Sequence, residues 1–202
     1  NTTAATNFSF KAPMEEIREY IALDAAQILI PTPEPNSLVP NQNLKGTIFS
    51  NGDVDYLIIT PQALASQAER LADFHRNNSG LQVQVVILQQ IYNEFNTGNQ
   101  DIGAIRNFIK YVYDNASSDE NRLKYVCLFG DASYDYKDRI EENTNIVPVF
   151  QAYESFNLTR GFMTDDFYGM MDDTEGILAV ADRLVIALGR MLITLANQAK
   201  AT

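Results

Sequence analysis

The stretch Tyr125-Val-Cys-Leu-Phe-Gly-Asp-Ala-Ser-Tyr-Asp-Tyr-Lys137 decides the fold of this chain. Its first five residues form the apolar run of a buried strand, and the run ends at Gly130-Asp131. An aromatic and acidic loop follows at once. Because ligands of parallel α/β sheets bind just beyond the carboxyl ends of the strands, this stretch predicts both a strand and a candidate site.

Two further markers follow the first one along the chain. Thr164-Asp-Asp-Phe-Tyr-Gly169 is a second acidic and aromatic cluster, and Asp172-Asp173 comes soon after it. Gly189-Arg190 closes a predicted strand at residues 184–188. The three markers in this order form a more specific sequence pattern than any one marker alone. The connection over residues 131–182 is too long for an ordinary loop, which indicates that it is functional.

From residue 51 onward, apolar runs of strand type alternate with segments of helical periodicity. Thr60-Pro61 is a good start for a helix that runs to His75, and residues 77–80 stop it. Asp101 is expected to cap a further helix. The alternation predicts an α/β fold, a Rossmann-like three-layer sandwich in which helices flank a parallel sheet of about four strands. The strands are expected at residues 56–60, 81–87, 123–129 and 184–188, with an edge strand at residues 147–151.

Residues 1–50 differ from the rest of the chain and are expected to be a lead-in or linker with short β elements. Residues 8–10 are a candidate strand, and residues 14–25 mix helix and strand signals. Four prolines between residues 31 and 40 forbid regular structure. Residues 41–46 are predicted to form a turn. The sequence therefore divides into a lead-in at 1–50 and an α/β domain at 51–202.

Composition narrows the classes of function. The net charge of −11 argues against nucleic acid and against charge-driven docking on an anionic membrane. No stretch approaches the roughly 20 apolar residues that span a bilayer, and the single cysteine rules out an internal disulfide. The first residues do not resemble a signal peptide. Residues 195–200 resemble the start of a helix, so we expect the chain to be a piece of a longer protein.

The common nucleotide and zinc motifs are absent from the sequence. It has no G-x-G-x-x-G, no P-loop, and too few Cys and His residues for a zinc site. Cys127 lies mid-strand among apolar residues, which favours an inert buried thiol. His75 lies near a helix end. We expect structural roles for both residues, and no nucleophile and base pair between them.

Asp131 is the strongest candidate site residue, because an acid at the carboxyl end of a strand has no packing role. It is either a metal ligand or substrate contact, or a loop carboxylate that caps backbone N–H groups. Carboxylates that converge on one loop region would suit Ca²⁺. The aromatic residues of the segment, Tyr134, Tyr136, Phe167 and Tyr168, are expected to serve core and hinge packing rather than to form a substrate platform. The other acids of the segment are Asp165, Asp166, Asp172, Asp173, Glu175 and Asp182.

A dense set of segments, from about residue 40 to the end, resembles the gingipain-type cysteine peptidase family, and within it the sortases of the type IX secretion system of Bacteroidota. Besides the three markers, the segments are Asn41-Gln-Asn-Leu-Lys-Gly46, Asp55-Tyr-Leu-Ile-Ile-Thr-Pro61, His75-Arg76, Ile91-Tyr-Asn-Glu-Phe95, and residues 101–109. The resemblance implies a caspase-like fold whose catalytic His and Cys follow Gly189-Arg190. Residues 51–202 would then be the first, non-catalytic subdomain, truncated before the catalytic one.

The resemblance also implies function, partners and a metal. The parent protein would remove the C-terminal signal domains of secreted cargo and attach the cargo to a surface lipopolysaccharide through a thioester. Its partners would be the catalytic second subdomain, the cargo proteins and other type IX surface components, on the outer face of the outer membrane. Calcium would bind near Asp131, Asp172, Asp173 and Asp182. The fragment itself is expected to be inactive.

One alternative from another class stays open. The chain would then be a standalone α/β module that binds a cation or small ligand through the Asp131 loop. A Gly-His-Gly element and a strand-end Cys encoded downstream would establish the peptidase hypothesis, and a stop codon near residue 202 would favour the module. If the chain is one subdomain, we expect an apolar face that promotes self-association.

Overall fold

The computed structural model describes residues 41–152, 157, 161–176 and 182–200, together with residues 9, 11, 19, 26, 28–30 and 39. The chain divides into two compact units, Asn1–Pro40 and Asn41–Thr202, and the second holds the α/β fold. The candidate strand at residues 8–10, the mixed segment at 14–25 and the proline-rich stretch lie outside the described residues, apart from single positions. No helix in the described part of the chain has the length and hydropathy to cross a membrane.

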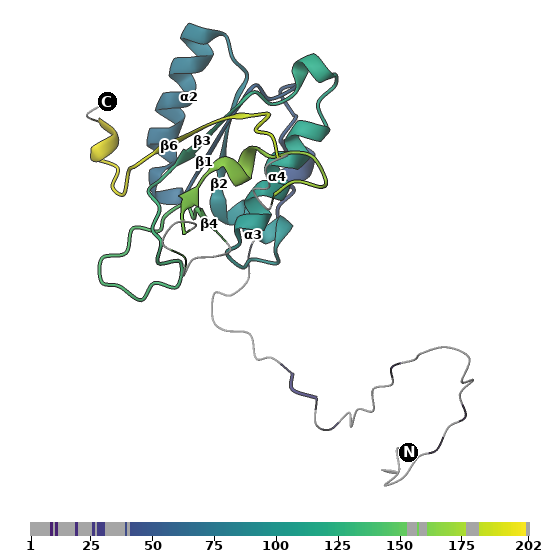
Figure 1. Ribbon diagram of the computed structural model, residues 1–202. Coiled ribbons are helices and arrows are strands. Elements are labelled where there is room, and N and C mark those ends of the chain that lie inside the picture. The colour runs from purple at the N-terminus through teal and green to yellow at the C-terminus, as the bar shows by residue number, and fades with distance from the viewer. Residues whose placement is uncertain are drawn as a thin grey trace. The chain divides into compact units, whose positions relative to one another are not determined.

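Four parallel strands form the central sheet in the order β2-β1-β3-β6, which confirms the predicted α/β class (Figure 1). Tyr56 lies opposite both Val83 and Tyr125, and Tyr125 lies opposite Ala187. The chain adds β2 on one side of β1 and β3 on the other. Such a change of direction marks the crevice where ligands of open α/β sheets bind. The strands are β1 (Tyr56–Thr60), β2 (Val83–Ile87), β3 (Tyr125–Phe129) and β6 (Ala187–Met191).

The two central strands are buried on both faces. Four of the five residues of β1, and four of the five of β3, are buried. Parallel strands covered on both sides need apolar side chains that point both ways, which explains their continuous apolar sequences. Leu57 and Ile59 point to one face of the sheet, and Ile58 points to the other.

Helices cover both faces of the sheet (Figure 1). On one face α2 (Ala65–Ser79) packs Ala68 and Ala72 against Ile58. On the other face lie α3 (Leu88–Phe95) and α4 (Ile102–Asp114). The short side chains of α2 let it lie close to the strands.

The helix ends follow the predicted signals except at Thr60, which ends β1 and caps no helix, because its hydroxyl donates a hydrogen bond to the Phe129 carbonyl at 3.2 Å. A 3₁₀ turn, η2 (Gln62–Leu64), follows Pro61 and leads into α2. This helix continues to Ser79 and ends at Gly80, whose φ of 65° is the left-handed conformation that glycine adopts easily. The Asp101 carboxylate accepts a hydrogen bond from the Gly103 N–H at 2.9 Å, so its predicted capping role at α4 is confirmed.

The segment predicted as a turn at residues 41–46 instead contains a short helix, α1 (Leu44–Thr47). The Asn43 side chain caps it, and the Glu94 carboxylate of α3 accepts hydrogen bonds from the N–H groups of Leu44 and Lys45. Leu44 and Ile48 are buried in the core. The compact unit therefore begins at Asn41, whereas the boundary predicted from the sequence follows residue 50.

In its described residues, the long connection between β3 and β6 contains little regular structure. The predicted edge strand is reduced to β4 (Phe150–Gln151), which pairs antiparallel with β5 (Met163–Thr164). The fourth main strand, predicted at residues 184–188, lies three residues further on. Leu184 and Val185 are about half exposed and precede it. Short 3₁₀ turns lie at η3 (Asp119–Asn121), η4 (Asp166–Gly169) and η5 (Gln198–Lys200).

Candidate functional site

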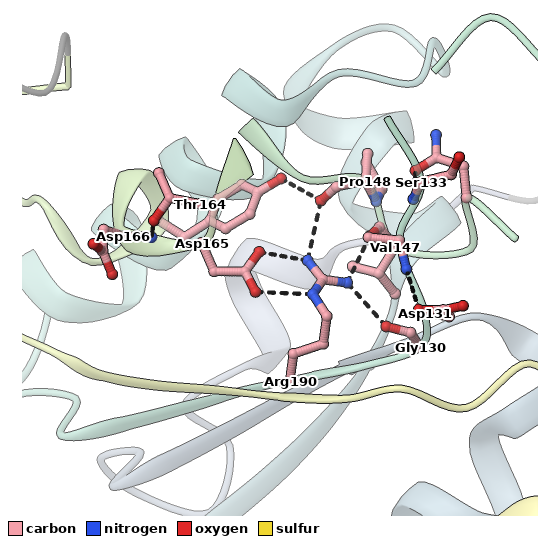
Figure 2. A network of polar contacts seen from close by, with 12 residues as sticks. Gly130, Asp131, Ser133, Val147, Pro148, Thr164, Asp165, Asp166 and Arg190 are labelled. Atoms are coloured by element: carbon pink, nitrogen blue, oxygen red, sulfur yellow. Dashed lines mark hydrogen bonds and ion pairs between the residues drawn. The ribbon is translucent and has the colours of Figure 1, made fainter. Parts of the chain in front are cut away.

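The three sequence markers meet at the guanidinium of Arg190, near the carboxyl edge of the sheet (Figure 2). Arg190 points from β6 toward the loop that precedes η4. Its Nε and Nη2 donate hydrogen bonds to the two carboxylate oxygens of Asp165, at 2.8 and 2.6 Å. Two parallel bonds of this kind fix the orientation of both planar groups.

Arg190 also holds the loop that follows β3. Its Nη1 donates to the carbonyl oxygens of Gly130, at 2.9 Å, and Val147, at 2.7 Å, and Nη2 approaches that of Pro148 at 3.4 Å. The Arg190 side chain is 9% exposed, so these bonds lie largely away from water. One buried cation therefore joins the end of β3, the loop after it and the segment before η4.

Tyr168 strengthens the same junction. Its hydroxyl donates to the Pro148 carbonyl at 2.6 Å, and its ring is fully buried. Burial raises the pKa of Tyr168, so the hydroxyl stays protonated and remains a donor. The neighbouring Phe167 stacks on Phe150 of β4, with ring centroids 4.8 Å apart. The core packing predicted for these two aromatic residues is confirmed.

Gly130 is required by close packing at the end of β3. A Cβ atom at this position would lie 2.7 Å from Cγ2 of Val147 and 2.9 Å from Cγ2 of Ile146. Only a residue without a side chain lets the loop return so closely over the strand end. The glycine of the first marker is thus explained by the loop that Arg190 holds.

Asp131 has the capping role that was one of its two predicted interpretations. Its Oδ1 accepts a hydrogen bond from the Ala132 N–H at 2.9 Å. Its backbone N–H donates to the Ile193 carbonyl, and its carbonyl accepts from the N–H groups of Ile146 and Val147. Asp131 therefore organises the loop through its backbone and its carboxylate.

The acidic turn of Asp172 and Asp173 is held by α4. Arg106 donates to the carbonyl oxygens of Met170, Asp172 and Glu175. Lys110 forms an ion pair with Asp173 at 3.2 Å. Although burial alone would lower it, hydrogen bonds to Asp114 and Asp173 raise the pKa of Lys110.

The four acids predicted to bind calcium do not share one site. Asp131 follows β3 at the carboxyl edge of the sheet, whereas Asp173 lies beside Lys110 in the second half of α4, which runs toward the opposite edge. Asp182 accepts a hydrogen bond from the Gly176 N–H at 3.2 Å. In the described ranges, no three His, Cys, Asp or Glu residues are placed to hold a metal ion. No single ion joined to both Asp131 and the acidic turn is indicated by these positions, and calcium binding near the four acids stays a prediction.

A cavity of about 490 Å³ opens at the carboxyl edge, beside the start of α4. Tyr136 lines it and is 59% exposed, and Tyr134 is 64% exposed, so neither residue packs in the core, and that part of the prediction of core and hinge packing is wrong. No local sequence pattern indicates the cavity, because its walls come from segments far apart in the chain. They are formed by Gln100, Asp101, Ile102, Tyr136, Pro148, Val149, Gln151 and Ala152.

The family follows from a comparison with protein-family models. The model of peptidase family C25 matches residues 49–202, which include every element from β1 to η5. The chain belongs to peptidase family C25. The C25 domain is also similar to a crystal structure of dimeric latent PorU from Porphyromonas gingivalis, with 33% sequence identity and a TM-score of 0.66. That match covers 81% of this chain and 16% of the PorU chain. A search of curated proteins finds no significant match.

C25 peptidases use a cysteine, and the single cysteine of this C25 chain is poorly suited to attack. Cys127 lies in the middle of β3 and is 5% exposed. Burial raises the pKa of its thiol to about 11, although the neighbouring Tyr56 hydroxyl lowers it. The reactive form of a cysteine is the thiolate, so this thiol is a weak nucleophile at neutral pH.

His75 lines the same cavity as Cys127 on the α2 face of this C25 domain. Its Nδ1 lies 3.3 Å from the Ser79 hydroxyl oxygen, and its ring packs edge-on against Tyr56, with centroids 5.0 Å apart. These contacts hold the His75 ring against Ser79 and Tyr56. They match the structural roles expected for both residues.

Proposed function

We propose that this chain is the first, non-catalytic subdomain of a cell-surface sortase of the gingipain type. The observation that carries the proposal is the 33% identity to PorU, which extends over 81% of this chain. The match to the C25 family model over residues 49–202 supports a peptidase origin. The chain spans about a sixth of the PorU chain, and the activity proposed here belongs to a longer parent protein.

The proposed parent reaction is a transfer of cargo from peptide to surface. A thiolate attacks the carbonyl carbon at the junction between cargo and C-terminal signal domain. The amine of the signal domain takes a proton and leaves, and the cargo remains as a thioester. A nucleophile of the surface lipopolysaccharide then attacks the thioester, the thiolate leaves, and the cargo is attached to the cell surface. The partners are secreted cargo with C-terminal signal domains and other type IX components at the outer face of the outer membrane.

This chemistry needs an activated thiolate, a base and an oxyanion hole. The raised pKa of Cys127 and the packing of His75 support the proposal that the catalytic second subdomain supplies these groups. The role proposed for this subdomain is support. Arg190 holds three carbonyl groups and Asp165 in a fixed arrangement, so the carboxyl edge is a rigid platform for the catalytic half.

The proposal is tested by intact-mass analysis with a thiol-reactive peptidyl inhibitor, together with a peptide-cleavage assay. We expect neither labelling nor turnover by the 202-residue chain, and both by the full-length protein. Cys127→Ala in the full-length protein should leave turnover unchanged. Stoichiometric labelling of Cys127 in the 202-residue chain, accompanied by turnover, would overturn the proposal.

The alternative was a standalone module that binds a cation or small ligand through the Asp131 loop. In the structure, one carboxylate oxygen of Asp131 accepts the Ala132 N–H, and Asp131 is not among the residues that line the cavity at the carboxyl edge. No contact among the described residues favours the module. A stop codon directly after residue 202 in the gene would favour it.

A further inference from the structure

The small sheet formed by β4 and β5 leaves one edge of β4 open. Gln151 lies opposite Met163, and the next pair along the ladder is Ala152 and Phe162. The Ala152 N–H donates to the Phe162 carbonyl at 2.9 Å, so these two residues are a hydrogen-bonded pair. Because hydrogen-bonded and non-hydrogen-bonded pairs alternate along an antiparallel ladder, Gln151 and Met163 belong to the second kind. The N–H and C=O groups of Gln151 therefore point away from β5.

The same alternation extends to the residues before β4. The Pro148 carbonyl points inward, where it accepts hydrogen bonds from the Tyr168 hydroxyl and from Arg190 (Figure 2). Successive residues of an extended chain direct their backbone groups to opposite sides, so Val149 directs its groups the same way as Gln151. Among the described residues, none bonds the outward N–H and C=O groups of Val149 and Gln151.

The cavity at the carboxyl edge lies along this open edge of β4. Val149 and Gln151 are both part of its wall, and Gln100, Asp101 and Ile102 at the start of α4 supply further wall. Its volume of about 490 Å³ lies within the range of roughly 300–1,000 Å³ that is usual for ligand sites. The unpaired backbone groups of β4 therefore border a space that can hold a few residues of extended chain.

Exposed aromatic and apolar side chains surround the same edge. Tyr136 lines the cavity, and Tyr134 is also exposed and accepts a hydrogen bond at its carbonyl from the Gln151 side chain. The half-exposed Met163 shares a face with Gln151, because residues directly opposite in a ladder lie on one face. Tyrosine and methionine are enriched in protein interfaces. β4 is short, as edge strands often are, but it carries none of the charged side chains that discourage pairing.

The charge of the cavity indicates what kind of side chain it accepts. Asp101 is the single charged residue among the described residues of its wall. Its Oδ1 accepts the Gly103 N–H at 2.9 Å, and Oδ2 accepts no hydrogen bond within the described part of the chain. Lys137, whose Nζ lies 5.3 Å from the centre of the Tyr136 ring, is not part of the wall. A carboxylate oxygen in this position favours a Lys or Arg side chain, which forms a charge-assisted hydrogen bond with it.

We propose that the open edge of β4 binds an extended segment of another protein as a third strand, with a Lys or Arg side chain of that segment in the cavity beside Asp101. The backbone groups of Val149 and Gln151 pair with alternate residues of the bound segment. In this mode of recognition the main-chain hydrogen bonds supply affinity, and the pocket for a side chain supplies specificity. The proposal does not rest on the proposed function, because it follows from the ladder, the cavity and Asp101.

The test measures the binding of the fluorescein-labelled peptide Val-Thr-Lys-Thr-Val to the 202-residue chain by fluorescence anisotropy. Two further peptides carry backbone N-methyl groups, one on both Thr residues and the other on Lys and both Val residues. A strand that pairs along one edge uses only alternate N–H groups. We expect one methylated peptide to bind at least ten-fold more weakly and the other to bind like the unmodified peptide. Equal affinities of all three, weakening of both methylated peptides, or a Kd of the unmodified peptide above about 1 mM would overturn the proposal.

Two substitutions of Gln151 test the edge from the side of the protein. Gln151→Pro removes the outward N–H, and proline is tolerated where the N–H of an edge strand has no partner in the sheet. Gln151→Ala removes the same side chain and keeps the N–H, so it is the matched control. We expect the peptide to bind at least ten-fold more weakly to Gln151→Pro than to Gln151→Ala, with circular dichroism showing that both variants are folded. Equal affinities for the two folded variants would overturn the proposal.

Asp101→Asn tests the pocket, because Asn caps a helix as well as Asp does and lacks the charge. A second peptide carries Gln in place of Lys. We expect the Lys peptide to bind the wild-type chain several-fold more tightly than the Gln peptide, and both to bind Asp101→Asn equally. A preference for Lys that survives Asp101→Asn would overturn the proposal. A dimer of the chain that the peptide dissociates, seen by analytical ultracentrifugation, would assign the edge to a second copy and overturn it as well.

Discussion

The guanidinium of Arg190 and the carboxylate of Asp165 form a two-point ion pair between β6 and the segment before η4, with donor to acceptor distances of 2.8 and 2.6 Å. The pair is the centre of a network that includes three backbone carbonyls from the end of β3 and the loop after it. Loss of the guanidinium would leave the half-buried Asp165 carboxylate and the carbonyls of Gly130 and Val147 without this donor, whereas the Pro148 carbonyl would keep the Tyr168 hydroxyl. Removing one partner of a buried ion pair strongly lowers the free energy of unfolding, because the other charge stays buried without compensation.

Arg190→Met should therefore lower the free energy of unfolding by about 3–5 kcal/mol. Urea denaturation followed by circular dichroism measures this loss. Arg70→Met is the matched control, because Arg70 is exposed and bonds only the Gln67 side chain among the contacts found for it. A loss below about 1 kcal/mol, the range of surface ion pairs, would contradict the buried network described here.

Gly130→Ala and Gly189→Ala should have opposite consequences in the 202-residue chain. The first places a methyl group 2.7 Å from Val147 and should cost about 1–3 kcal/mol by overpacking. The second enters open space and should change stability by less than about 0.5 kcal/mol. Thermal unfolding of both variants gives the comparison. Similar losses at the two positions would be inconsistent with the packing around Gly130.

The Cys127 thiol should react slowly in the folded chain. With a pKa of about 11, about one part in 10⁴ is thiolate at pH 7. We expect alkylation by iodoacetamide to be at least ten-fold slower in native protein than in urea, and to accelerate as the pH rises toward 11. Because Cys127 is the single cysteine, total label reports on it alone. Equal rates in the folded and unfolded chain would show that the thiol is accessible and normal.

The carboxylate of Asp135 should protect the loop over residues 135–143 from proteases. It accepts hydrogen bonds from the N–H groups of Ile140, at 2.8 Å, and Arg139, and these bonds lower the pKa of Asp135. A lowered pKa in the fold means that the protection is complete above the ordinary value of 3.8 and is lost as the pH falls through the lowered value. Asp135→Ala should increase tryptic cleavage at Lys137 and Arg139 several-fold.

Glu141→Ala is the control for this loop, since the exposed Glu141 side chain forms none of these bonds and trypsin should cleave that variant at the wild-type rate. If Asp135→Ala and Glu141→Ala are cleaved equally fast, the Asp135 carboxylate does not organise the loop.

Calcium should not couple Asp131 to Asp173, because the two residues lie toward opposite edges of the sheet. Any change in melting temperature caused by calcium should respond to Asp131→Asn and Asp173→Asn independently, so that the effects of the two substitutions add. Differential scanning calorimetry of the single and double variants, with and without calcium, measures this. Loss of the whole calcium effect in each single variant would indicate one shared ion.

Most helices and strands could be predicted from the sequence, because the patterns that indicate them involve only neighbouring residues. The bounds of β1 agree with the prediction, and Asp101 caps α4 as expected, since an apolar run and a capping residue act within a few positions. The three-residue error at β6 has a physical reason. Leu184 and Val185 read as strand residues, but the Val185 N–H donates to the Gly169 carbonyl, and pairing with β3 begins at Ala187.

The candidate site was only partly predictable. The three markers at Gly130-Asp131, residues 164–169 and Gly189-Arg190 were found in the sequence, but the contact that joins them was not. An arginine inside a strand gives no sign of the carbonyls it will bond 43 and 60 positions away. The grouping of Asp131 with the acidic turn came from the family resemblance, and calcium binding there stays a prediction.

The long-range hydrogen bonds of Arg190 also have a consequence for folding during synthesis, because their acceptors precede Arg190 in the chain. On the ribosome, Gly130 and the segment up to Pro148 are synthesised before their buried cation exists. The nascent chain must hold β1, β2 and β3 together while the end of β3 still exposes carbonyls that have no protein donor. Synthesis of β6 supplies the donor groups and an additional strand at once, so completion of this sheet and fixation of its longest loop are expected to be a single late event in biogenesis.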